Sequence, residues 1–128
     1  MDPRIGDIRR KVARAGAAHP DDVDAVDDIL EAEGPNVELL LLRGQLIQLV
    51  ANGNADELEE AFACYQEALQ LDPENASIHE EIGHFLDAEA DDPAEAVIFF
   101  KKAIALGAGE SASEGLRDAL SQLDHEEL

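Results

Sequence analysis

The chain has 128 residues, 45% of them hydrophobic and 30% charged, which predicts one soluble domain with a single core. Nine basic and 30 acidic residues give a formal net charge of -21, which disfavours binding to nucleic acid and to anionic membranes. Cys64 is the only cysteine, which excludes an intrachain disulfide and a four-cysteine zinc site and favours a reducing, cytoplasmic setting.

The first segment of the chain differs from the rest in charge. Its first 14 residues hold five basic and two acidic side chains, a net charge of +3, whereas the remaining 114 residues carry -24. The segment lacks the apolar stretch of a signal peptide, and no run of about 18 apolar residues follows, so we expect neither secretion nor a membrane span. The basic side chains form either a solvated helix face or a docking arm for an acidic surface, such as the body of a second copy. They are Arg4, Arg9, Arg10, Lys11 and Arg14.

Turn signals divide the chain into seven pieces, each with the length of an ordinary helix. These signals stand at residues 19–20, 33–36, 52–54, 72–75, 91–93 and 107–109. Three of the following pieces begin with a capping-box pattern, in which a short polar residue precedes a glutamate by three positions. The short polar residues are Asn54, Asp92 and Ser111. No segment is typical of a strand.

Apolar residues recur at helical spacing, and their pattern repeats along the chain. A small, bulky, small pattern occurs twice at an offset of 35 residues, and a weaker copy lies 36 residues before the first. In chain order the copies are Ala25, Ile29 and Ala32; Ala61, Tyr65 and Ala68; and Ala96, Phe100 and Ala103. A glycine precedes each copy, at Gly6, Gly44 and Gly83. Fixed periods of this length indicate stacked supersecondary units.

This pattern resembles the tetratricopeptide repeat (TPR) family, most closely at residues 61–75. The family places a small residue in the first helix of each pair, small, bulky and small residues in the second, and a proline after it, here Pro73. The resemblance implies an all-α, right-handed solenoid of antiparallel helix pairs in a single domain, 1–128. The repeats would lie at about 4–34, 35–73 and 74–108, and a capping helix at about 111–123.

We expect no catalytic residue, no metal and no cofactor. His79 and His84 are five positions apart, whereas a helical zinc pair needs a spacing of three or four. Cys64 lies between two alanines of the packed pattern and is predicted to be a small structural residue. The aspartates between residues 21 and 28 lack the glycine of a calcium loop and are predicted to be first-turn acids favoured by the helix dipole.

The resemblance also implies a concave groove, lined by the first helix of each pair, as the binding site. Matching Gly44 and Gly83 to the small position of the family places nine residues there: Glu38, Leu41, Gln45, Gln48, Leu49, Ser77, Glu80, His84 and Asp87. Leu39–Leu42 are four consecutive leucines, so at least one should face away from the core, and Leu41 is the expected one. The alternative is a central helix that is buried all round.

These features are interpreted as a non-catalytic interaction adaptor that binds an amphipathic or basic peptide segment of another protein. Some family members hold acidic chaperone tails with cationic clamps. Leu41, Gln45, Glu80 and His84 stand at the matching places, so such tails are not expected as ligands. The alternative is a self-assembling scaffold, a homo-oligomer formed through the basic first helix or the exposed leucines. The acidity itself reflects either a basic ligand or adaptation to salt.

Overall fold

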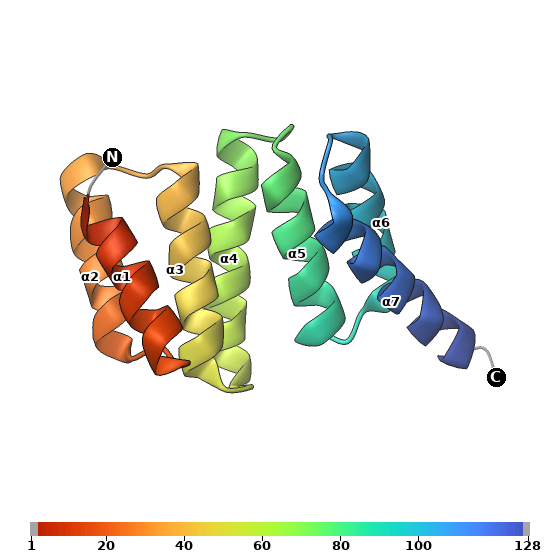
Figure 1. The fold of residues 1–128 in the computed structure, drawn as a ribbon, viewed down its shortest axis with the longest axis horizontal. Coiled ribbons are helices and arrows are strands. Elements are labelled where there is room, and N and C mark those ends of the chain that lie inside the picture. Colours follow the sequence, from red (N-terminus) through yellow and green to blue (C-terminus); the bar gives the residue numbers. More distant parts are fainter. Residues whose placement is uncertain (1–2, 127–128) are drawn as a thin grey trace. The chain divides into compact units, whose positions relative to one another are not determined.

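The computed structural model describes residues 3–126, and their side chains as far as residue 124. This part of the chain consists of seven helices without any strand, which confirms the predicted all-α class (Figure 1). The helices are α1 (Pro3–Ala15), α2 (Pro20–Glu33), α3 (Val37–Ala51), α4 (Ala55–Leu71), α5 (Ala76–Ala88), α6 (Pro93–Ala105) and α7 (Glu110–Glu126). Their six connections overlap with the six predicted turns, although Pro20 and Pro93 already belong to the helices that follow.

Two of the predicted caps are formed by the side chains at the turns. The Asn54 side-chain oxygen accepts a hydrogen bond of 3.1 Å from the backbone N–H of Glu57. The Asp92 carboxylate accepts one of 3.2 Å from the backbone N–H of Glu95. The prediction for Ser111 is wrong, because α7 begins one residue earlier and this side chain lies within the first turn.

The helices form two compact units, residues 1–71 with α1 to α4 and residues 72–128 with α5 to α7. In the first unit α3 packs against both α2 and α4, and in the second α6 packs against both α5 and α7 (Figure 1). Each predicted repeat contains one helix pair. The single domain and the solenoid stay predictions, and their limits, Met1 and Leu128, lie outside the described residues.

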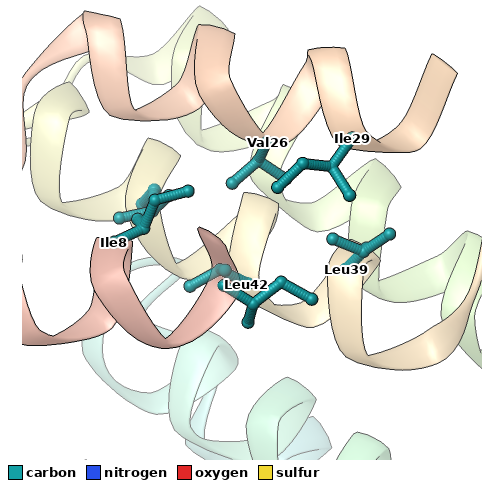
Figure 2. Close-up of a cluster of buried hydrophobic side chains, with 7 residues drawn as sticks. Ile8, Val26, Ile29, Leu39 and Leu42 are labelled. Carbon is teal, nitrogen blue, oxygen red and sulfur yellow. The ribbon is translucent and has the colours of Figure 1, made fainter. Parts of the chain in front are cut away.

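The core of the first unit forms where α1, α2 and α3 meet (Figure 2). Ile8, Val26 and Leu39 point toward one another from these three helices, and all three are buried. The prediction for the weak copy of the repeat, Ala25, Ile29 and Ala32, is only partly correct. Its bulky residue is fully buried, but Ala32 at the following small position is exposed. The buried residues of α2 are therefore shifted relative to the pattern seen in α4 and α6.

The two aromatic residues of the repeat lie against helical glycines. A Cβ atom added to Gly44 would collide with the ring of Tyr65, and one added to Gly83 would come within 2.8 Å of the Phe100 ring. Both rings are fully buried. Glycine at the crossing lets the helix backbones approach closely, and the ring fills the space beside the contact. The four alanines of these two copies are also fully buried: Ala61, Ala68, Ala96 and Ala103.

The glycine pattern needs two corrections. Gly6 does not serve a helix crossing, because a Cβ atom there would meet only the flexible guanidinium of Arg10. Gly115 of α7 does serve one, since a Cβ atom there would lie 2.5 Å from the Phe100 ring. The ring of Phe100 therefore packs against glycines of two helices. Like Gly83, Gly115 is a glycine within a helical pattern of apolar residues. This pattern could have predicted the close contact at Gly115 from the sequence.

Candidate functional site

The predicted site residues of α3 lie on one side of that helix, turned away from the core of the first unit. Of the four consecutive leucines, Leu41 alone is half-buried, while Leu39, Leu40 and Leu42 are buried. The expectation for Leu41 is confirmed, and the alternative of a helix buried all round is wrong. Leu49, two turns further along, is 55% exposed. This side of α3 thus offers apolar surface to solvent.

The polar residues on this side of α3 are engaged to different degrees. A carboxylate oxygen of Glu38 lies 3.9 Å from the guanidinium of Arg9 in α1, at a surface position. The amide oxygen of Gln48 accepts a hydrogen bond from the hydroxyl of Tyr65. Gln48 therefore has a structural partner in α4, because a buried phenol needs an acceptor. Gln45 is half-buried, between the two leucines along the helix.

We define the α3 face as Glu38, Leu41, Gln45 and Leu49, and leave out Gln48 because of its bond to Tyr65. The residues proposed on α5 form a second set, the α5 face, which consists of Ser77, Glu80, His84 and Asp87. Ser77 is exposed and the other three are half-buried. The two faces belong to different units, and each is described by itself.

Helix α7 contacts part of the α5 face. The side-chain amide of Gln122 donates a hydrogen bond of 2.6 Å to the carboxylate of Asp87. The imidazole Nε2 of His84 lies 3.5 Å from the hydroxyl of Ser111 and 3.3 Å from a carboxylate oxygen of Glu80. The sequence predicted a capping helix here but no contact between it and these residues, so both contacts were missed.

Ser111, His84 and Glu80 together include the residue types of a catalytic triad, but their geometry differs from one. In a triad the carboxylate binds one imidazole nitrogen and the hydroxyl binds the other, so that the histidine accepts the hydroxyl proton while the carboxylate orients the ring. Here both contacts are made by Nε2. The rings of His84 and Phe100 meet in a T-shaped arrangement, with centroids 4.9 Å apart. The arrangement fits a packed histidine better than an activated nucleophile.

The second histidine of α5 has a structural role. His79 is buried, and its Nε2 lies 2.7 Å from the carbonyl oxygen of Pro73, which can only accept, so Nε2 is the donor. Its Nδ1 has no hydrogen-bond partner in the described part of the chain. His79 and His84 lie on different sides of α5, as their spacing predicts. Among the described residues no group of three or more histidine, cysteine or acidic side chains could hold a metal ion.

Arg43 connects three helices of the first unit, and the sequence patterns did not single it out. Its Nε donates to Asp27 of α2 at 2.6 Å, and its Nη2 donates to Glu60 of α4 at 2.8 Å. Its Nη1 lies 3.1 Å from the sulfur of Cys64. Burial opposes the charged form, but the hydrogen bonds to Asp27 and Glu60 outweigh it and raise the pKa of Arg43. These two ion pairs link α3 to both of its neighbours, α2 and α4.

Cys64 is buried beside this arginine. Burial raises the pKa of the thiol, and the neighbouring guanidinium opposes this only in part. A raised pKa keeps the thiol protonated and poorly nucleophilic. This agrees with the prediction of a small structural residue.

One of the predicted first-turn acids has a more specific role. The side chain of Asp22 is 5% exposed and accepts hydrogen bonds from Lys11 Nζ at 2.7 Å and from the backbone N–H of His19 at 2.8 Å. The hydrogen bond from Lys11 lowers the pKa of Asp22 by more than burial raises it. Asp22 therefore links α1 to the start of α2, beyond the interaction with the helix dipole that the sequence predicts.

This pair predicts a pH-dependent contribution to stability. The folded-state pKa of Asp22 is below its ordinary value of 3.8, so the contribution is fully present above that value and is lost as the pH falls through the folded pKa. Replacing Asp22 by asparagine should lower the free energy of unfolding by about 1–2 kcal/mol at neutral pH, and the difference from the wild type should shrink below about pH 4. Urea denaturation measured across pH tests this.

Asp21→Asn is the matched control, because it removes the same charge from the same turn at an 80% exposed side chain. We expect it to change stability by less than about 0.5 kcal/mol. A difference for Asp22→Asn that is equal at pH 7 and pH 3 would contradict the assigned pair.

Part of the chain matches a known protein family. A family model described as TPR repeat matches residues 55–86, which include α4 and most of α5. No curated protein matches the chain. The matched segment contains Tyr65 with its two flanking alanines, and Gly83. In the part of the chain that the structure describes, no helix combines the length and apolar character needed to cross a membrane.

TPR proteins are generally non-catalytic modules for protein–protein interaction. The match includes residues 61–75, where the resemblance in the sequence is strongest. Residues 55–86 of the chain are therefore similar to a tetratricopeptide repeat, which is generally found in modules that bind other proteins.

Proposed function

We propose that the chain is a non-catalytic adaptor that binds an amphipathic or basic segment of a partner protein through the α3 face and the α5 face. The observation that carries the proposal is the apolar surface of α3, where Leu49 is 55% exposed and Leu41 is half-buried on the same side. Leucines exposed on a helix face, with polar residues beside them, are suited to an amphipathic partner.

The leucines should supply most of the affinity. Full burial of one leucine side chain contributes about 1.5–3 kcal/mol, whereas an exposed ion pair contributes under about 1 kcal/mol. Glu80 and Asp87 on the α5 face add negative charge, which favours a basic partner and mainly raises the rate of association. The net charge of -21 acts in the same direction.

Two leucine variants test this proposal. The partner is first captured from a lysate of the source organism, and its binding kinetics are then measured. Leu49→Glu should weaken binding at least about tenfold, because it replaces apolar contact with a charge that must be desolvated. Leu41→Glu should have the same effect if the variant keeps its helical circular dichroism.

Leu71→Glu is the matched control, since Leu71 is 51% exposed at the end of α4 and lies outside both faces. It should bind the partner as the wild type does. Glu80→Lys should slow association chiefly at low salt. Normal binding by Leu49→Glu together with loss of binding by Leu71→Glu would contradict the proposal and place the working surface elsewhere.

A further inference from the structure

The first unit has a second candidate surface, on the side of α3 opposite to the α3 face. A hollow of about 190 Å³ lies there among α2, α3 and α4. Its apolar part is formed by Val23, Ile47 and Val50. At 100° per residue, Ile47 and Val50 lie on the other side of α3 from Gln45. The hollow is smaller than the roughly 300–1,000 Å³ of small-molecule sites, so it suits side chains of a protein partner.

Carboxylates surround this hollow. Glu60 is already paired with Arg43. Asp24 and Glu57 are exposed and form no ion pair with another described residue. An apolar hollow with uncompensated negative charge at its edge fits a basic side chain with a long aliphatic stem, because the stem covers the apolar atoms and the charged end reaches the carboxylates.

Helix α1 carries side chains of this kind. Arg10 and Arg14 are one turn apart on its exposed side, whereas Lys11 is already paired with Asp22 of α2. Arg10 pairs only with Asp7 of the same helix, and Arg14 forms no ion pair within the described residues. The opposite side of α1 is anchored in the core by Ile5 and Ile8, so the basic side points away from the body of its own unit.

We propose that the hollow binds α1 of a second copy of this chain. Charge complementarity favours this occupant, because α1 lies in the basic segment of an otherwise strongly acidic chain. In each molecule α1 is held in the core, and its basic side faces outward. Its Arg10 and Arg14 therefore cannot reach the hollow of the same molecule. Only a second copy can bring these arginines to Asp24 and Glu57. The proposal concerns other residues than the α3 and α5 faces, and the two succeed or fail independently.

Two opposing electrostatic effects give this association a characteristic salt dependence. At about 0.01 M salt the Debye length is about 30 Å, and two bodies of net charge -21 repel each other. At about 0.1 M it is about 10 Å, so the repulsion is screened while ion pairs at contact persist. At about 1 M the ion pairs are also weakened. Self-association should therefore be strongest at intermediate salt.

Sedimentation velocity over a protein concentration series that reaches the millimolar range tests the proposal. Arg10→Glu/Arg14→Glu makes the arm acidic, and Asp24→Lys/Glu57→Lys makes the hollow basic. Each double variant alone places like charges at the contact and should weaken self-association by about tenfold or more. An equimolar mixture of the two should associate again, because each arm then meets a hollow of opposite charge.

Glu59→Lys/Asp118→Lys is the matched control, since both residues are exposed and outside the hollow, and it changes the net charge as much as the hollow variant does. It should associate at least as well as the wild type. Circular dichroism melts verify that every variant folds. A wild-type chain that is monomeric at all concentrations and salts overturns the proposal and leaves the hollow to a basic segment of another protein. Equal association of the wild type and both double variants overturns it too.

Discussion

Replacing Phe100 by alanine should lower the free energy of unfolding by about 3–5 kcal/mol, the typical cost of removing a buried phenylalanine ring. The ring is fully buried and lies against both Gly83 and Gly115. Its removal leaves a cavity bordered by three helices of the second unit, and glycines have no side chains that could fill it. Loss of the ring removes part of the packing between α6 and both of its neighbours.

Denaturant unfolding followed by circular dichroism measures this effect, with Ile98→Ala as control. Ile98 is in the same helix but is 65% exposed, so its substitution should change stability by less than about 0.5 kcal/mol apart from helix propensity. If the two units unfold in separate transitions, only that of the second should move. Equal effects for Phe100→Ala and Ile98→Ala would contradict the packing described for Phe100.

Gly44→Ala should destabilise the chain by about 1–3 kcal/mol, even though alanine is the better helix former. A methyl group at this position would overlap the ring of Tyr65, which is fully buried and hydrogen-bonded to Gln48. The ring or the α3 backbone must therefore move. The gain in helix propensity, about 1 kcal/mol, offsets only part of this cost.

Gly6→Ala is a control with the opposite expected sign. It is the same substitution in another helix, but the added methyl would contact only the side chain of Arg10, at 3.3 Å. This variant should be more stable than the wild type by about 0.5–1 kcal/mol. Thermal melts of the two variants should shift in opposite directions. Stabilisation by both substitutions would mean that α3 and α4 do not cross closely at Gly44.

The two proposed surfaces of the first unit lie on opposite sides of α3. Leu49 belongs to the α3 face, which is proposed to bind another protein. Val50, the next residue, lines the hollow proposed to bind a second copy of the chain. Neighbouring positions on one helix point about 100° apart, so substitutions can affect one surface without touching the other. The two binding modes can therefore be separated in the same protein, and a homo-oligomer could still present its α3 faces to another protein.

Features that depend on a few neighbouring residues were predictable from the sequence. The turns and the caps at Asn54 and Asp92 were correct, because a cap is an interaction within about three residues. Gly44 and Gly83 were correctly identified as the small residues of the first helices, because the same pattern occurs in more than one repeat. Leu41 was identified as the least buried of the four consecutive leucines because a helix buries only part of its circumference.

Contacts between residues far apart in the chain were not predictable in this way. Arg43 meets Asp27 and Glu60, which are 16 and 17 residues away, and no local pattern distinguishes it from a solvated arginine. Asp22 was assigned to the helix dipole because its partner, Lys11, belongs to another helix. In a chain with 30 acidic residues, the sequence offers many candidate carboxylates for each cation.

By itself the sequence determined the all-α class, the approximate positions of the seven helices and the side of α3 that avoids the core, since turn chemistry and helical periodicity act over short distances. The tertiary structure decided which polar side chains form hydrogen bonds or ion pairs with other helices. It also decided where apolar surface lies beside carboxylates that have no ion-pair partner among the described residues. Gln48 and Asp87 acquired partners, and the hollow beside Val50 arose only when α2, α3 and α4 came together. Such features depend on side chains from several helices converging in space, and periodicity within one helix carries no information about that convergence.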